Sequence, residues 1–170
     1  MTDNSPYLEN KFRLADIIAA LQILGSYTWA SREWDNWEKK LGTPRSAGNW
    51  KIIFNEHPEF FRVSLPDKKN KEWVSLRWRH GYDKNFDIEQ GKELSKSEFD
   101  LLEKSLLKQQ LNERLTRKAL TAEQIEALIN TAIELHERTI AHKEEKRWLI
   151  PFLFAFVGII IGAILQAALK

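Results

Sequence analysis

The chain has 170 residues and a net charge of +2, and residues 1–90 hold 14 Lys or Arg against 13 Asp or Glu. This balance excludes the bulk basic excess that dominates DNA binding, so a nucleic-acid site would have to be a local patch. The lack of cysteine excludes disulfides, thiolate metal sites and a cysteine nucleophile.

Three short helices are predicted before Pro58. The first covers residues 11–25, where apolar side chains recur at helical spacing and a glycine provides a natural stop. The second covers residues 31–41 and starts at a serine that can cap it. The third covers residues 46–57 and closes before the proline, because the residue before proline disfavours helix. Six of the seven tryptophans fall in the first 80 residues, where we expect most of them to pack in the core.

The period of the apolar pattern then changes from helical to alternating. Apolar and polar side chains alternate over residues 60–65 and again over residues 73–79. The polar stretch between them, residues 66–71, contains a proline and three lysines and reads as a turn. The pattern predicts a β-hairpin with a charged tip.

This order of three helices and a hairpin resembles a winged-helix domain over residues 11–90. The resemblance implies that residues 46–57 occupy the recognition position and that residues 67–71 form the wing. The blocks NWKIIFNEHPEFFRV and WVSLRWRHGYD also look like short bacterial membrane proteins that carry the automated name N-carbamoyl-L-amino acid hydrolase. Hydrolases of that name are far longer and use a two-metal cluster of His, Asp and Glu, for which this chain has no matching constellation.

Two further helices are predicted beyond residue 91, each opened by a capping-box pattern. Ser95 with Glu98 starts the first, and Thr121 with Gln124 starts the second. One face of the second helix is apolar and consists of Ile125, Leu128, Ile129, Ala132 and Ile133. This face could pack between neighbouring copies of the chain, or it could cover the core of its own domain.

Residues 149–169 read LIPFLFAFVGIIIGAILQAAL, without a charged residue. As a helix this segment would be about 31 Å long, which matches the ~30 Å hydrocarbon thickness of a bilayer. Lys143, Lys146 and Arg147 precede it and place the N-terminal domain in the cytosol, while Trp148 fits the interfacial belt. The sequence therefore predicts a single-pass, tail-anchored protein with the lipid bilayer as a partner.

Small residues recur along one stripe of this segment. Gly158 and Gly162 form a Gly-x-x-x-Gly pair, and Gln166 can hydrogen-bond between helices. Because helix association in lipid depends on close backbone approach and such hydrogen bonds, the stripe predicts a homo-oligomer.

These elements predict a mainly α fold with a small β-hairpin, that is, a winged-helix-like α+β domain with a helical stalk and one C-terminal transmembrane helix. The predicted organisation is a winged-helix-like cytosolic domain over 1–90, a helical segment and stalk over 91–147, and a transmembrane anchor over 148–170.

A local basic patch is the candidate nucleic-acid site. If the wing lies beside the third helix, one face could present phosphate-binding and base-approaching side chains: Arg45, Asn49, Lys51, Lys68, Lys69, Lys71, Arg77 and Arg79. The alternative is a solvated hairpin, since lysine routinely protects edge strands.

Catalytic signals are sparse. The chain has no P-loop, no nucleophile elbow and no convergent metal-ligand pattern, so no cofactor, no metal and no catalytic residue is predicted. The third hypothesis is a small hydrolase, which would require Glu56, His57, His80 and Asp83 to cluster. We favour a non-enzymatic sensor, adaptor or effector that recognises a protein or ligand and self-associates through its stalk and anchor, with a membrane-tethered nucleic-acid-binding regulator as the alternative.

Overall fold

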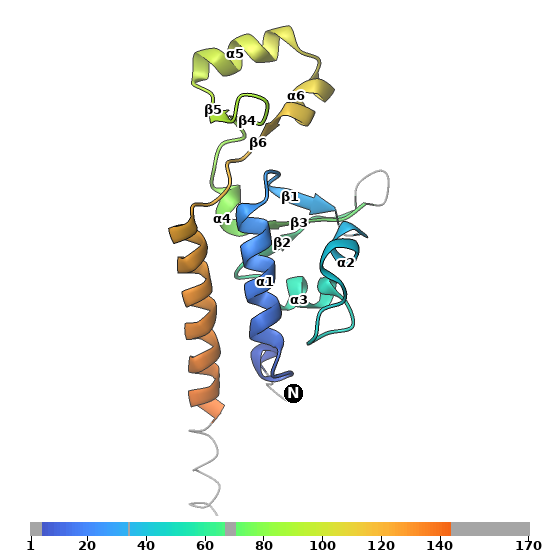
Figure 1. Ribbon diagram of the computed structural model, residues 1–170, viewed down its shortest axis with the longest axis vertical. Helices are drawn as coiled ribbons and strands as arrows, with labels where there is room; N and C mark the ends of the chain where they lie inside the picture. Colours follow the sequence, from blue (N-terminus) through green and yellow to red (C-terminus); the bar gives the residue numbers. More distant parts are fainter. Residues whose placement is uncertain (1–4, 34, 67–70, 144–170) are drawn as a thin grey trace, which may run out of the picture.

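The computed structural model describes residues 5–33, 35–66 and 71–143. The fold is α+β, with two three-stranded antiparallel sheets in which the strand orders are β1-β3-β2 and β5-β4-β6. Figure 1 shows the first sheet beside α1, and the second sheet together with α5 and α6 at one end of the molecule.

The N-terminal helices pack against the first sheet. A short 3-10 helix, Pro6–Leu8, leads into α1, Arg13–Ser26, whose buried face carries Ile17, Ala20, Leu21 and Leu24. Helix α2 is Asp35–Leu41 and α3 is Trp50–Glu56. Helix α3 begins where it does because the Asn49 side chain accepts a hydrogen bond from the Ile52 amide and so caps the first turn.

The first sheet contains β1, Ser31–Glu33, β2, Phe61–Val63, and β3, Trp73–Leu76. Strands β2 and β3 confirm the predicted hairpin. Two local predictions are wrong. Residues 31–33 form an edge strand paired with β3 rather than a helix start, and residues 77–80 form the short helix α4, Arg77–His80, rather than extending the strand.

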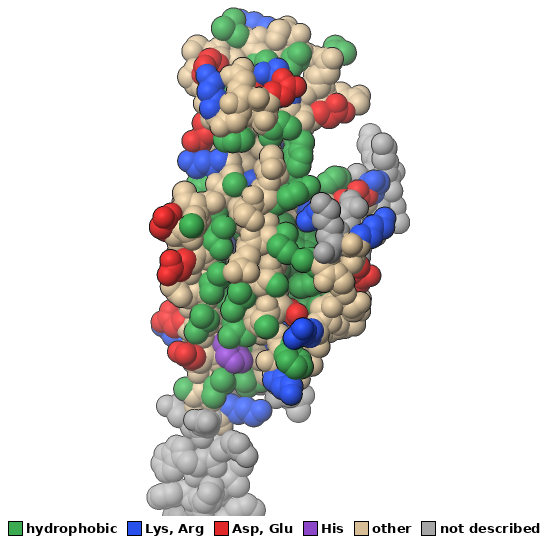
Figure 2. Space-filling view, viewed as in Figure 1, with side chains coloured by type: hydrophobic (Ala, Val, Ile, Leu, Met, Phe, Trp, Pro, Cys, Tyr) green, Lys and Arg blue, Asp and Glu red, His purple; other side chains and the backbone are tan. Residues whose placement is uncertain are grey.

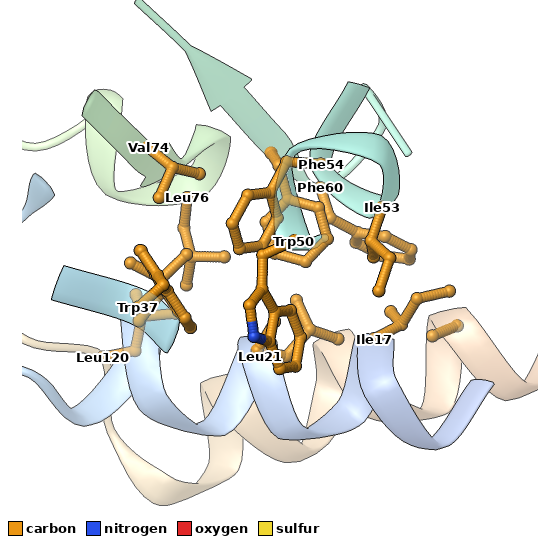
Figure 3. Close-up of a cluster of buried hydrophobic side chains, with 14 of the residues drawn as sticks. Ile17, Leu21, Trp37, Trp50, Ile53, Phe54, Phe60, Val74, Leu76 and Leu120 are labelled. Carbon is orange, nitrogen blue, oxygen red and sulfur yellow. The ribbon is translucent and has the colours of Figure 1, made fainter. Parts of the chain in front are cut away.

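An aromatic cluster fills the space between these elements (Figure 3). The ring centroid of Phe54 lies 5.0 Å from that of Trp37 and 4.9 Å from that of Phe61, with both pairs edge to face. The Trp50 ring stacks at 6.0 Å from Phe54, and Leu21 and the other apolar residues of α1 close the cluster below. Trp37 and Trp50 are therefore core residues, as expected, because aromatic rings bury much area in a small domain.

The second sheet consists of two-residue strands: β4, Phe86–Asp87, β5, Lys92–Glu93, and β6, Leu115–Thr116. Helices α5, Lys96–Ser105, and α6, Lys108–Arg114, connect β5 to β6. The predicted capping box at Ser95 and Glu98 is present. The buried Asp87 carboxylate ties β4 to the end of α6 through an ion pair with Arg114 at 2.6 Å.

Residues 122–143 are helical and run beside α1 (Figure 1). The contact is close, because a Cβ placed on Gly25 of α1 would lie 2.6 Å from Cγ1 of Ile125. Ala132 is fully buried, and Ile125, Leu128 and Ile129 pack against the core. Of the two roles open to this apolar face, covering the domain's own core is the one observed.

The predicted fold class is wrong. In place of a mainly α domain with one small hairpin, the described residues form two three-stranded sheets accompanied by helices. No helix within 5–33, 35–66 and 71–143 is both long and apolar enough to cross a membrane. The segment 149–169, with Gly158, Gly162 and Gln166, lies outside the described residues.

Candidate functional site

A pocket with a volume of about 880 Å³ lies between the first sheet and the segment that ends α6 and forms β6. Figure 2, in the same view as Figure 1, shows a notch between the part that carries α5 and α6 and the part that carries the first sheet. One wall is formed by Tyr27, Trp29 and Ala30. A second wall is formed by Lys84, residues 112–113 and residues 115–117. Three segments that are distant in the sequence therefore build one site.

The open face of the first sheet forms the floor of this pocket. Its strand register places Ser31 opposite Ser75, and Ser75 opposite Arg62. Trp73 lies two residues before Ser75 on the same face, and its backbone amide donates to the Ser64 hydroxyl at 2.9 Å. The floor therefore presents three small serines beside Trp73, and Glu33 lies directly opposite Trp73 on the neighbouring strand.

Four cationic side chains line the pocket without a carboxylate partner. They are Arg32, Arg62, Lys84 and Arg117, and none forms an ion pair within the part of the chain that the structure describes. The pocket acids do not neutralise them. Glu33 pairs with Lys71 at 2.5 Å, and Glu113 accepts a hydrogen bond from the side chain of Gln109 at 3.0 Å. The pocket therefore carries excess positive charge.

Arg32 is the most unusual of the four. It is only 7% exposed, and its Nε has no hydrogen-bond partner among the described residues. Its guanidinium lies 4.5 Å from the ring centroid of Tyr27 and 5.8 Å from that of Trp37. Cation–π contacts offset only part of the cost of removing a charge from water, so a buried arginine without a hydrogen-bonded anion is destabilising by itself.

A hydrogen-bonded chain on the floor fixes the state of His80. Nη1 of Arg62 lies 3.3 Å from Nδ1 of His80, and Nε2 of His80 lies 3.1 Å from the Ser75 hydroxyl oxygen. Arginine has no acceptor, so Nδ1 must accept, and Nε2 carries the proton that it donates to Ser75. Burial, and then the positive charges of Arg117, Arg62 and Arg77, lower the pKa of His80, which keeps the ring neutral.

Arg79 supports the pocket from behind. It is fully buried, and its guanidinium donates to backbone carbonyl oxygens of Leu24, Tyr27, Thr28, Trp29 and Arg117, at 2.6 to 3.1 Å. Burial and the neighbouring Arg117 lower its pKa to about 10. This side chain fastens one pocket wall to the other, and it has no exposed surface with which to contact a phosphate.

The other residues proposed for nucleic acid that the structure describes lie outside the pocket. Lys51 pairs with Glu72 at 2.6 Å, and Lys71 with Glu33. Arg77 donates to the Pro58 carbonyl, and the Asn49 side chain caps α3. The Arg45 guanidinium lies 5.9 Å from the ring centroid of Phe12, and Lys68 and Lys69 lie outside the described residues.

The residues suggested for hydrolysis are separated. His57 is fully buried, with Nδ1 3.0 Å from Oε1 of Glu59, and the Tyr7 hydroxyl donates to the same oxygen at 2.9 Å. Burial raises the pKa of Glu59, but hydrogen bonds from His57, its own amide and Tyr7 outweigh that effect and lower it. Glu56 pairs with Arg13, whereas His80 belongs to the pocket. Within the described ranges, no group of three or more His, Asp or Glu is placed to hold a metal ion.

Sequence reasoning missed Arg32, Arg62, Lys84, Arg117 and the pocket itself. The one available signal was the alternation that put Arg62 and Ser75 on the polar face of the hairpin. Comparisons with protein-family models, curated proteins and solved structures find no match to this chain. The site must therefore be interpreted from its own geometry and charge.

Proposed function

We propose that this chain is a membrane-attached recognition protein that binds a small anionic ligand in the pocket between its two sheets. The observation that carries the proposal is that the pocket cations Arg62, Lys84 and Arg117 form no ion pair with any residue that the structure describes. Several basic side chains outside the pocket do have carboxylate partners: Arg13 pairs with Glu56, Lys92 with Glu98 and Arg138 with Glu134. An anion in the pocket would supply the missing partner.

Arginine suits this role because its planar guanidinium donates two parallel hydrogen bonds to a carboxylate or phosphate. The pocket also brings Lys84 and Arg117 from one wall toward Arg62 on the floor. The effect of Arg117 on its neighbours supports a positive local potential, since its charge contributes to a lowered pKa of both His80 and Lys84 after burial. Such a potential favours capture of anions.

The state of His80 favours recognition over hydrolysis. Ser75 beside a histidine is the pair expected of an activated nucleophile, but a base must accept the hydroxyl proton. Here Arg62 occupies Nδ1 of His80, so Nε2 already carries a proton and cannot accept one from Ser75. Ser75 is itself buried. The arrangement therefore supports binding of a ligand rather than covalent chemistry.

The membrane location and the cytosolic orientation rest on the sequence of residues 149–169 and its basic flank, and both stay predictions. Removal of residues 149–170 is expected to release the protein from membranes. Protease added outside intact cells should leave the N-terminal part uncut. Self-association through Gly158, Gly162 and Gln166 likewise stays a prediction.

The direct test of the proposed function is calorimetric titration of full-length protein in detergent with inorganic phosphate and pyrophosphate. We expect saturable binding that weakens as salt concentration rises. The double variant Arg62→Gln, Arg117→Gln should weaken binding by at least about tenfold, because each charge-assisted hydrogen bond contributes roughly 1.5–3 kcal/mol. The matched control is Arg138→Gln, which removes an exposed cation outside the pocket. Equal binding by both variants, or no binding by the parent protein, would refute the proposal.

A further inference from the structure

We propose that the anion is the phosphate of a nucleoside phosphate, with its base stacked on Trp73 and its phosphate held by Arg62 and Arg117. This inference rests on the proposed function and names the ligand class for that same pocket. The shared chemistry is a phosphorylated nucleoside, and its source is either a free nucleotide or the end of a nucleic-acid strand.

The size of the pocket argues against an inorganic anion as the whole ligand. Its volume of about 880 Å³ is in the range of pockets that enclose organic molecules of drug size, about 300–1,000 Å³. One phosphate would satisfy the cations and leave most of that space to water. A ligand that fills the pocket must carry a larger body beside its charge.

Trp73 supplies the surface for that body. Its side chain is 36% exposed although it lines the pocket, and no ring contact involves it within the described part of the chain. On the sheet face Trp73 lies between Glu33 of β1 and Ser64, with Ser75 two residues along β3. The two serines are too small to cover the indole. A partly exposed aromatic ring in a groove lined by cations is the arrangement on which proteins stack nucleic-acid bases.

The register of the sheet sets the spacing between base and phosphate. Arg62 lies directly opposite Ser75, so Trp73, two residues away on β3, is its diagonal neighbour on the same face. Such diagonal positions are about 7–8 Å apart, within reach of long and aromatic side chains. A sugar bridges a base and its phosphate over a comparable span, so one nucleotide can contact both side chains.

Hydroxyl groups lie where the sugar would pass. The Ser64 oxygen accepts from the Trp73 amide, so its own proton remains available for a ligand oxygen. Ser31 lies on the same floor, in line with Ser75. A sugar with free hydroxyl groups can exchange hydrogen bonds with these serines, which a purely apolar body could not do.

The experiment is a set of titrations of the full-length protein in detergent. The ligands are inorganic phosphate, adenosine, adenosine 5′-monophosphate, uridine 5′-monophosphate and a 5′-phosphorylated RNA hexamer. We expect the nucleotides to bind at least about fivefold more tightly than phosphate, because stacking of one base contributes roughly 1–3 kcal/mol. Adenosine without phosphate should bind more weakly than its monophosphate. A hexamer that binds more tightly than the mononucleotides would identify the strand end as the source, and weaker binding would identify the free nucleotide.

The decisive variant is Trp73→Leu. This change should remove most of the difference in affinity between the nucleotides and inorganic phosphate. The affinity for phosphate itself should stay within about twofold, because the cations are unchanged. Trp73→Tyr keeps a ring and should retain part of the gain, which separates stacking from misfolding. Trp78→Leu is the matched control, since Trp78 is 39% exposed and lies outside the pocket.

The two proposals fail in different ways. If phosphate binds and nucleotides bind no more tightly, or if Trp73→Leu leaves the nucleotide gain intact, the nucleotide inference is overturned while anion recognition stands. If neither phosphate, pyrophosphate nor any nucleotide binds, both are overturned.

Discussion

Nδ1 of His80 lies 3.3 Å from Nη1 of Arg62. A protonated histidine would carry an N–H donor at Nδ1, and that donor would point at the positively charged guanidinium. Burial and the charges of Arg117, Arg62 and Arg77 all oppose protonation of this ring and lower its pKa. An anion that neutralises Arg62 and Arg117 would remove part of that opposition. Protonation of His80 and occupation of the pocket are therefore expected to be coupled.

The first prediction is a pH dependence with opposite signs for stability and for binding. Because the pKa of His80 is lower in the folded than in the unfolded state, the unfolded state binds more protons, and this group costs stability as pH falls through about 6.5. A bound anion raises the pKa of His80 again, so anion affinity should increase over the same fall in pH. Thermal unfolding and sulfate titration between pH 8 and pH 5.5 measure the two effects, because sulfate, unlike phosphate, keeps its charge over this range. In His80→Gln both dependences should be reduced, and an unchanged affinity profile in that variant would contradict the coupling.

The second prediction separates two buried arginines. Arg32→Met should leave the free protein as stable as the parent or raise its unfolding free energy by about 1–4 kcal/mol, because an unpaired buried charge is removed. Arg79→Met should lower it by more than about 3 kcal/mol, since five carbonyl groups lose a charged donor. Denaturant unfolding measures both. Phosphate affinity should fall in Arg32→Met, and a strongly destabilised Arg32→Met with normal affinity would show that Arg32 is structural.

Local patterns predicted the elements whose signals are contained in a few adjacent residues. The hairpin of β2 and β3 and the capping box at Ser95 and Glu98 follow from alternation and from a four-residue motif. The strand Ser31–Glu33 could not be predicted in this way, because it exists only through pairing with β3 some 40 residues later. The sequence around Ser31 equally suits a helix cap, and tertiary pairing overrides that preference.

The pocket was unpredictable for a related reason. Arg32 appears in the sequence as one charge among many, and its burial depends on β1 pairing, on Tyr27 and on the α2 residue Trp37. Arg79 was expected on the exposed face of a strand, but the chain turns into α4 there and points it at carbonyl groups. Alternation predicts which side chains share a face, but it does not show which distant segment will cover that face.

The third prediction concerns the contact between α1 and the helix over residues 122–143. Gly25→Ala would put a methyl group 2.6 Å from Cγ1 of Ile125, so the Ile125 side chain or one of the two helices must shift. We expect a loss of about 1–3 kcal/mol in the unfolding free energy, typical of overpacking. Gly48→Ala is the matched control, because nothing lies within 4 Å of its added Cβ and no positive φ forbids it. If the contact is responsible, adding Ile125→Ala to Gly25→Ala should cost less than the two single changes together.

The last prediction tests whether the second sheet holds the far wall of the pocket. The Asp87 carboxylate accepts hydrogen bonds from Arg114 and from the amides of Glu89 and Gln90, and these interactions outweigh burial and lower its pKa. A carboxyl group with a lowered pKa adds stability that is present above its unfolded pKa of about 3.9 and is lost as pH falls through its folded pKa.

Asp87→Asn keeps the shape but removes the charge, so it should lower the melting temperature by roughly 5 °C or more at pH 7. It should also weaken the steep loss of stability below pH 4. Because Arg114 immediately precedes the pocket-lining pair Leu115 and Thr116, we further expect phosphate affinity to fall by less than about tenfold, with no change in its salt dependence. Melting curves at pH 7 and pH 3.5 with one phosphate titration at each of two salt concentrations provide the measurement. An altered salt dependence would mean that Asp87 acts on the bound anion through its charge and not through the position of the wall.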